Sequence, residues 1–261
     1  MKIVRVMTFN LRTDSIFDIR NPWKSRKTMV NNIIGMYSPD IIGVQELNNS
    51  MFRDLSESVK DQYNIVGEAR TKKLFAEKND ILVKKNHTIK NHTTFWLSNK
   101  PERVGSSQWH SLFPRICTTA LIEMESGEMV RVYNTHLDCI SPWARDYGLK
   151  KISEIIEQNY ESENVPVMVM GDFNATPGSK TIQNFIALNK DKRNFIAVQE
   201  SNKEMYSEST MSKFKGSTKG LHIDYIFVSD EFNVMSSEIV RYNENGKYPS
   251  DHYPLIAELT L

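Results

Sequence analysis

Two stretches of the chain share one layout, and this layout restricts the possible folds more than any other feature. In each stretch an apolar, strand-like run is followed by a helical segment and a second apolar run, and each run ends in a polar residue. The runs end at Asn10 and Glu46 in the first stretch and at His136 and Asp172 in the second, 36 residues apart in both. Parallel strands joined by a right-handed crossover place their carboxyl ends at one edge of a sheet. We therefore expect these four side chains to meet at a common rim.

Short apolar runs and helical stretches alternate along the whole chain. Runs rich in β-branched residues predict strands over residues 3–10, 41–44, 63–69, 80–85, 93–98, 115–124, 129–137, 165–171, 222–229, 233–241 and 254–261. Helical spacing of apolar residues predicts helices over about 22–37, 50–59, 142–160 and 181–188. The pair Ser126-Gly127 marks a hairpin turn. Because no linker rich in Gly, Pro or Ser interrupts the pattern, we expect a single domain over residues 1–261.

The charge balance and the cysteines limit the possible partners and the compartment. With 33 basic and 32 acidic side chains, the protein has no strong overall field for nucleic acid, although a local basic groove is compatible with this balance. The first ten residues lack the apolar run of a secretory signal, and no segment is apolar enough to span a membrane, so we expect a cytoplasmic protein without a membrane span. Cys117 and Cys139 favour two buried free thiols in that compartment, with a disulfide as the alternative.

Polar side chains gather where the predicted strands end. Each of them alone has an ordinary structural explanation as a cap, a turn residue or a structural histidine. The set comprises Asn10, Glu46, His136, Asp138, Asp172, Asn174, Asp251 and His252, joined by Asp224 at an apolar strand. Together their carboxylate and amide oxygens suit a hard cation such as Mg²⁺. The chain has neither a thiolate cluster nor an HExxH motif, so zinc is disfavoured.

The order of these motifs resembles the endonuclease/exonuclease/phosphatase superfamily, the DNase I-like group that includes nucleases, deadenylases and inositol phosphatases. The match consists of Asn10, Glu46 and the segments NTHLD, GDFN, DYIFVS and SDHYPL, and it runs from Asn10 to His252. The resemblance implies an α/β four-layer sandwich, with two packed mixed β-sheets flanked by helices. It also implies a hydrolase that uses Mg²⁺, or Mn²⁺, to cleave a phosphoric ester by direct attack of water.

The resemblance assigns roles to individual residues of the metal and water sites. Glu46, helped by Asn10 and Asp251, is expected to hold the metal ion against a phosphate oxygen. Asp172 is expected to orient or deprotonate the attacking water. Asn174 is expected to position this water or a phosphate oxygen.

Two histidines complete the site that the resemblance implies. His252 is expected to contact the phosphoryl group while a hydrogen bond with Asp224 fixes its tautomer. His136 is expected to donate a second hydrogen bond to the phosphate. In DNase-like members its partner is a Glu before a strand, and Glu77 occupies the comparable place.

The substrate is the least determined part of the prediction. The candidate substrate-binding residues are Glu77, Asn79, Trp109, Arg115 and Asp138. Among the aromatic residues near the site, Phe95 and Trp96 fit a strand of the core, whereas Trp109 and Phe113 fit a wall of the site that could stack on a base.

These residues favour a phosphodiester, cleaved by a nuclease or deadenylase-like enzyme whose partner is nucleic acid or a nucleotide. A phosphomonoesterase or a lipid or sugar-phosphate hydrolase is the alternative. A non-catalytic binding module is disfavoured because the whole set of site residues is present. We expect a monomer, although the sequence leaves the oligomeric state open.

Overall fold

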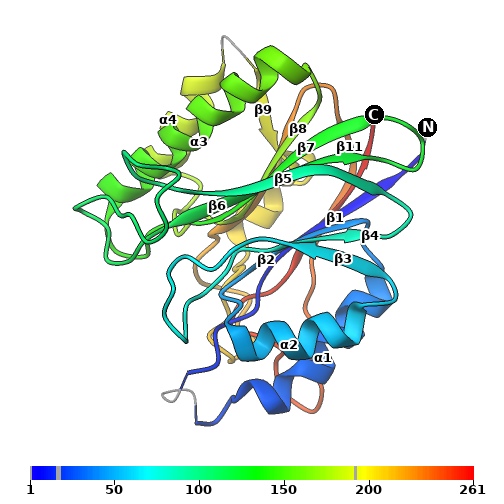
Figure 1. The fold of residues 1–261 in the computed structure, drawn as a ribbon. Coiled ribbons are helices and arrows are strands. Elements are labelled where there is room, and N and C mark those ends of the chain that lie inside the picture. The colour runs from blue at the N-terminus through cyan, green and yellow to red at the C-terminus, as the bar shows by residue number, and fades with distance from the viewer. Residues whose placement is uncertain (1, 16–18, 191–192) are drawn as a thin grey trace.

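The computed structural model describes residues 2–15, 19–190 and 193–261, and in it two six-stranded mixed sheets pack face to face (Figure 1). The first sheet has the order β11 (Asn233–Ile239), β12 (Leu255–Thr260), β1 (Val4–Asn10), β2 (Ile41–Gln45), β4 (Ile81–Lys84) and β3 (Tyr63–Val66). The second has the order β5 (Thr88–Trp96), β6 (Ile116–Glu123), β7 (Met129–His136), β8 (Val167–Asp172), β10 (Asp224–Ser229) and β9 (Phe195–Ala197). Helices α1 (Trp23–Tyr37) and α2 (Asn49–Val59) cover the first sheet, and α3 (Pro142–Glu163) and α4 (Lys180–Asn189) cover the second. This arrangement confirms the predicted four-layer sandwich.

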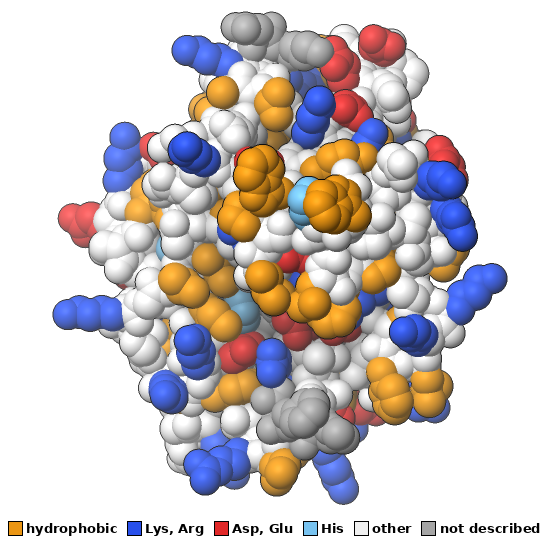
Figure 2. Space-filling view, turned by 90° about the vertical axis from the view of Figure 1, so that its left-hand side faces the viewer, with side chains coloured by type: hydrophobic (Ala, Val, Ile, Leu, Met, Phe, Trp, Pro, Cys, Tyr) orange, Lys and Arg blue, Asp and Glu red, His pale blue; other side chains and the backbone are white. Residues whose placement is uncertain are grey.

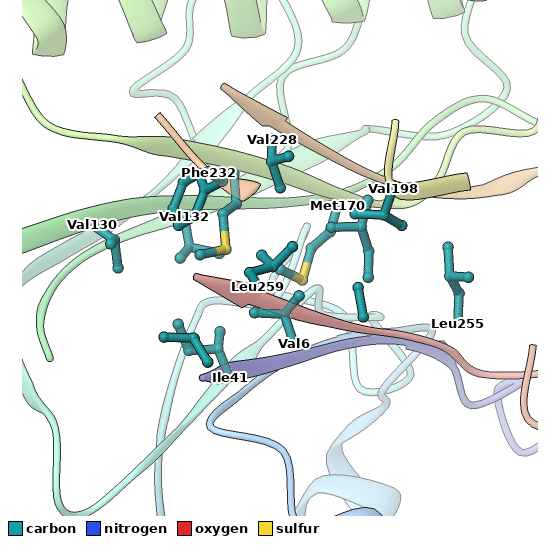
Figure 3. Packing of buried hydrophobic residues seen from close by; sticks show 14 of the residues in the cluster. Val6, Ile41, Val130, Val132, Met170, Val198, Val228, Phe232, Leu255 and Leu259 are labelled. Atoms are coloured by element: carbon teal, nitrogen blue, oxygen red, sulfur yellow. The ribbon is translucent and has the colours of Figure 1, made fainter. Parts of the chain in front are cut away.

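The interior has three apolar layers, and the central strands contribute to two of them. Between the sheets, Val6 and Ile41 of the first sheet face Val132 and Met170 of the second (Figure 3). The next residue along β1, Met7, belongs to the layer between the first sheet and its helices. A third layer lies between the second sheet and α3 and α4. Because both faces are buried, these strands are nearly continuous apolar runs in the sequence.

Local signals in the sequence explain where the helices begin. Asn48 accepts a hydrogen bond from the backbone N–H of Ser50 and caps α2. Ser141 and Ser179 cap α3 and α4 in the same way. Helix α1 begins directly after Pro22, as predicted. A side-chain cap of this kind stabilises a helix by about 1 kcal/mol.

Two regions of the second sheet differ from the prediction. Strand β5 begins at Thr88 and not at residue 93. The prediction missed its first half because this part is an exposed sheet edge with polar side chains such as Lys90 and His92. Strand β9 and two 3₁₀ helices (Val198–Ser201 and Lys203–Ser207) were not predicted. These segments are too short for an apolar period to identify them.

The structure bears on two further expectations, about the cysteines and about membrane spans. Cys117 and Cys139 are both free thiols, but only Cys117 is buried as predicted, because Cys139 lies in the exposed turn before α3. Burial raises the pKa of the Cys117 thiol well above its usual range, so this thiol stays protonated. Among the described helices, none combines the length and the apolarity of a membrane span.

The two repeated units form parallel strand pairs, as their layout predicted. Strand β1 pairs with β2 so that Asn10 lies beside Gln45, next to Glu46. Strand β7 pairs with β8 so that His136 lies beside Asp172. Strand β10 runs antiparallel to β8 and places Asp224 beside Asp172 on its other side. Each sheet therefore carries a row of polar residues at one edge.

Candidate active site

Asn10 joins the polar edges of the two sheets. Its side-chain Nδ2 donates hydrogen bonds to Glu46 Oε1 at 3.1 Å and to Asp172 Oδ2 at 3.0 Å. Glu46 follows a strand of the first sheet, whereas Asp172 ends a strand of the second. The polar strand ends therefore meet at one rim, and a fully buried amide holds the two sheets in register there.

Two residues of the rim adopt left-handed backbone conformations. Glu46 has φ 61° and Asn174 has φ 48°. This conformation is unfavourable for a side chain such as Glu, and outliers of this kind cluster at functional sites. Local hydrogen bonds stabilise it: Glu46 Oε2 accepts from the N–H of Thr13 at 2.9 Å, and Asp172 Oδ1 accepts from the N–H of Asn174 at 2.9 Å. The tight turns direct both side chains along the rim.

Two imidazoles approach the same carboxylate oxygen. The Nε2 atoms of His136 and His252 lie 3.6 Å and 3.7 Å from Asp172 Oδ2. On the other side of its ring, His252 Nδ1 donates to Asp224 Oδ2 at 2.9 Å. The hydrogen bond predicted between Asp224 and His252 is thus present, and it leaves Nε2 directed into the site.

Burial and neighbouring charges shift the pKa values of the two imidazoles in opposite directions. Burial, together with the positive charge of Arg115, lowers the pKa of His136 well below its usual range. Burial also opposes protonation of His252, but Asp224 and Asp172 outweigh it and raise the pKa of His252 well above its usual range. A neutral and a charged imidazole side by side can take different roles in one reaction.

Burial disfavours the charged form of two carboxylates of the rim. Burial and the nearby Asp224 raise the pKa of Asp172. Burial, with Glu46 as a further contributor, raises the pKa of Asp251. A bound cation would favour the charged form of both carboxylates.

Two sets of residues could hold that cation. The predicted set of Asn10, Glu46 and Asp251 offers only oxygen ligands, which fits Mg²⁺. A second set, Asp172, Asp224 and His252, is buried, and one possible ligand atom from each residue lies within 4.8 Å of the others. The sequence did not predict this second set. Its imidazole already uses Nδ1 for Asp224, so these residues also form a hydrogen-bonded group.

Arg26 is a positioning residue that sequence reasoning missed. Its buried guanidinium donates hydrogen bonds of 2.7 Å to the carbonyl oxygens of Leu11, Arg12 and Pro249. It thereby ties the segment after Asn10 to the segment before Asp251. In the sequence it is one arginine among several in a helical stretch, and no local pattern distinguishes it from a solvated surface charge.

Three of the candidate substrate-binding residues lie beside His136. Glu77, Asn79 and Arg115 line one small recess together with His136 and Arg70. Glu77 forms an ion pair of 2.8 Å with Arg70, a residue that the sequence analysis did not select. The Asn79 side chain donates to a backbone carbonyl at 3.0 Å and is buried. Glu77 therefore positions an arginine, where the resemblance suggested a partner for the histidine.

Asp138 organises the loops around the site. Its Oδ1 accepts from the N–H groups of Ile140 and Ser141, and its Oδ2 accepts from Ser111 and from the N–H of Leu112. These hydrogen bonds lower the pKa of Asp138, although its burial opposes the shift. With both oxygens engaged, Asp138 holds the loop of residues 99–114 against the start of α3.

An aromatic stack lies between the loop of residues 99–114 and the start of α3. Trp109 is 83% exposed, and its ring centroid lies 3.6 Å from that of His110. His110 stacks in turn with Trp143 at 6.3 Å, a residue that the sequence analysis missed. Figure 2 shows groups of hydrophobic side chains on one face of the molecule, with acidic and basic side chains between them. Phe95 and Trp96 are buried in the core, as expected.

The fold and the site together define a class of protein. Two packed mixed sheets with carboxylates, amides and imidazoles at one rim are the architecture of DNase I-like hydrolases of phosphoric esters. The chain belongs to the Endonuclease/Exonuclease/phosphatase family, whose sequence model matches residues 7–252.

Known proteins similar to this chain include nocturnins and a sugar phosphatase. Nocturnin of Xenopus laevis is 23% identical over 262 residues, which cover 92% of this chain and 65% of nocturnin. The structure of a mannosyl-6-phosphatase of Bacteroides thetaiotaomicron has a TM-score of 0.88 at 24% identity, over 99% of this chain and 100% of that chain. The human Nocturnin catalytic domain, with bound sulfate, has a TM-score of 0.77 at 19% identity, over 99% and 94% of the two chains. These structures share the fold, and the chain spans just under two thirds of the length of the nocturnin from Xenopus.

Proposed function

We propose that this chain hydrolyses a phosphoric ester by direct attack of water, with a divalent cation, Mg²⁺ or Mn²⁺, at the rim. The position of Asp172 carries the proposal. Its Oδ2 accepts a hydrogen bond from Asn10 and faces the Nε2 atoms of His136 and His252. A carboxylate in this position can take a proton from water as the water attacks phosphorus.

The other residues of the rim would stabilise the phosphoryl group. Glu46, Asn10 and Asp251 would hold the cation, which withdraws charge from the phosphoryl oxygens when it is bound. Protonated His252 would donate from Nε2 to a phosphoryl or leaving-group oxygen. Neutral His136 would donate a weaker hydrogen bond from its own N–H.

Direct attack by water predicts inversion of configuration at phosphorus. No Ser or Cys of the chain lies in a GxSxG nucleophile motif, whereas Asp172 can serve a water molecule. Hydrolysis of a chiral phosphorothioate in ¹⁸O-labelled water should therefore give the inverted product. Retention would indicate a covalent phosphoenzyme and would contradict the proposal.

Activity should depend on the cation through Glu46. We expect Glu46→Gln to raise the metal concentration needed for half-maximal activity and to lower kcat by at least about a hundredfold, because a neutral amide binds a hard cation poorly. The exposed pair Lys60–Glu57 supplies the control, since Glu57→Gln should leave both values unchanged. Titration of Mg²⁺ and Mn²⁺ into chelator-treated protein measures the effect. Full activity in excess chelator would exclude the metal-dependent mechanism.

The phosphodiester predicted from the sequence remains one of two candidates for the substrate. It is supported by the similarity to nocturnin and by the exposed stack of Trp109, His110 and Trp143, on which a base could lie. A phosphomonoester is the second candidate. It is supported by the likeness to a mannosyl-6-phosphatase and by the two arginines beside His136.

Trp109 should affect affinity for a base without affecting the fold. Stacking on a base contributes about 1–3 kcal/mol, so Trp109→Ala should lower kcat/KM for a nucleotide substrate by about ten- to hundredfold. Hydrolysis of a small chromogenic ester should be almost intact. Because the side chain is 83% exposed, the melting temperature should not change.

The exposed Met235 on β11 offers a control for the loss of apolar surface. Met235→Ala should leave kcat/KM for the nucleotide and for the small ester unchanged. Equal losses on the nucleotide and on the small ester would contradict the role of the loop in specificity.

A further inference from the structure

A small recess beside His136 is lined by two arginines. It has a volume of about 10 Å³, and its lining comprises Arg70, Arg115, Glu77, Asn79 and His136, among others. His136 also belongs to the catalytic group, since its Nε2 lies 3.6 Å from Asp172. A ligand in the recess would therefore touch the catalytic group directly.

The two guanidinium groups are held in place from several sides. Arg70 pairs with Glu77 at 2.8 Å, and its guanidinium carbon lies 4.8 Å from the ring centroid of Phe113. The guanidinium carbon of Arg115 lies 6.0 Å from the same ring. Strand β5 fixes the main chain as well, because the Trp96 indole N–H donates to the Arg70 carbonyl at 2.8 Å.

Arg115 retains a donor that the described protein groups do not use. The residue is only 6% exposed, and its Nε has no hydrogen-bond partner among the described residues. Asp138 Oδ2 is 3.6 Å away, beyond hydrogen-bond distance, and already accepts from Ser111 and from Leu112. A buried charged donor without a hydrogen-bond partner is costly, and the residue that carries it lines the recess.

The size of the recess limits which anion fits. Pockets that enclose whole organic ligands have volumes of about 300–1,000 Å³, whereas this recess has about 10 Å³, room for one water-sized group. It can take one terminal oxygen of a phosphoryl group and has no room for a nucleoside or a sugar. Guanidinium groups match phosphate oxygens through paired hydrogen bonds. A phosphomonoester presents two negative charges to the two guanidinium groups, whereas a phosphodiester presents one.

We propose that Arg70 and Arg115 bind the terminal oxygens of a phosphoryl group with two negative charges, so that the enzyme prefers phosphomonoesters to phosphodiesters. This proposal rests on the proposed function and selects the second of its two substrate candidates. Arg70 is the specificity-determining residue: it adds a second guanidinium to the recess, and Glu77 holds it there.

The test compares p-nitrophenyl phosphate with bis(p-nitrophenyl) phosphate, which share a leaving group and differ in charge. We expect the wild type to prefer the monoester. Arg70→Gln should lower kcat/KM for the monoester by about ten- to hundredfold, the effect of one charge-assisted hydrogen bond, and change the diester less than about threefold. Inorganic phosphate should inhibit the wild type competitively and inhibit Arg70→Gln more weakly.

Arg70→Lys keeps the positive charge without the paired N–H donors of a guanidinium group, so it should recover part of the preference for the monoester. This variant also tests the proposal if Arg70→Gln does not fold. Arg103→Gln, at an exposed arginine of the neighbouring loop, is the matched control and should leave both rates unchanged. A wild type that prefers the diester, or equal losses on the two substrates in the Arg70 variants, would overturn the selectivity and leave the hydrolytic function standing. Hydrolysis of neither substrate with Mg²⁺ or Mn²⁺ would overturn the proposed function and the selectivity with it.

Discussion

Asp172→Asn should abolish most of the activity while the protein becomes no less stable. The loss of a general base lowers turnover by about a hundred- to ten-thousandfold. Burial and Asp224 both disfavour the charged form of Asp172, so a neutral side chain of the same shape removes an unfavourable charge from the folded state. Steady-state kinetics at saturating Mg²⁺ and a thermal melt of the same preparation measure the two effects.

Asp40→Asn is the control, because it should lower stability and leave activity unchanged. Asp40 accepts a hydrogen bond from the N–H of Arg5 at 2.8 Å and lies 3.3 Å from His87 Nε2. Burial opposes ionisation of Asp40, but these partners outweigh it and lower the pKa of Asp40. A lowered pKa means that the ionised form stabilises the fold above the unfolded pKa, a contribution that is lost as pH falls through the folded pKa. Asp40→Asn should therefore lower the melting temperature at neutral pH and keep kcat. Activity of Asp172→Asn within tenfold of the wild type would rule out Asp172 as the base.

Gly171→Ala should strongly destabilise the folded state. Gly171 lies in β8 with φ 141°, a conformation that L side chains rarely adopt. A Cβ atom there would lie 1.9 Å from the carbonyl oxygen of Thr135 in the adjacent strand β7. Neither backbone can move without breaking the parallel pair that aligns His136 with Asp172. We expect a loss of several kcal/mol in the free energy of unfolding, at the upper end for a point mutation, measured by urea denaturation.

Gly35→Ala tests whether this effect is specific to the site. Gly35 lies in α1, and a Cβ atom there would meet nothing within 4 Å. Because alanine favours helix over glycine, this variant should gain about 0.5–1 kcal/mol. If Gly171→Ala unfolded at the same urea concentration as the wild type, the close approach of β7 and β8 would not be the constraint described above.

Much of the rim could be predicted because its signals are local. A buried strand is visible as an apolar run, and its polar end is visible one residue later, so the spacing of Asn10 and Glu46 and of His136 and Asp172 was sufficient to predict a shared edge. Helix starts at Pro22 and Ser141 also depend on neighbouring residues alone. Features that depend only on neighbouring residues can be predicted from the sequence.

The residues that escaped prediction act through partners far along the chain. Arg26 contacts Pro249, and Trp143 completes a stack that begins at Trp109. Arg70 lies in a basic stretch and becomes distinctive only when folding brings Arg115 and His136 next to it. No periodicity or motif encodes such contacts, because each depends on how the loops pack.

The interleaving of the two sheets makes the chain suitable for fragment complementation. A cut at the turn after β6, near Gly127, would leave Asn10 and Glu46 on one piece and His136 and Asp172 on the other. Each sheet would contain strands from both pieces, through the pairs β6–β7 and β1–β12. Neither piece would hold a full set of site residues, so hydrolysis would begin only on reassembly. If the two pieces were fused to two proteins that bind each other, hydrolysis would report the binding.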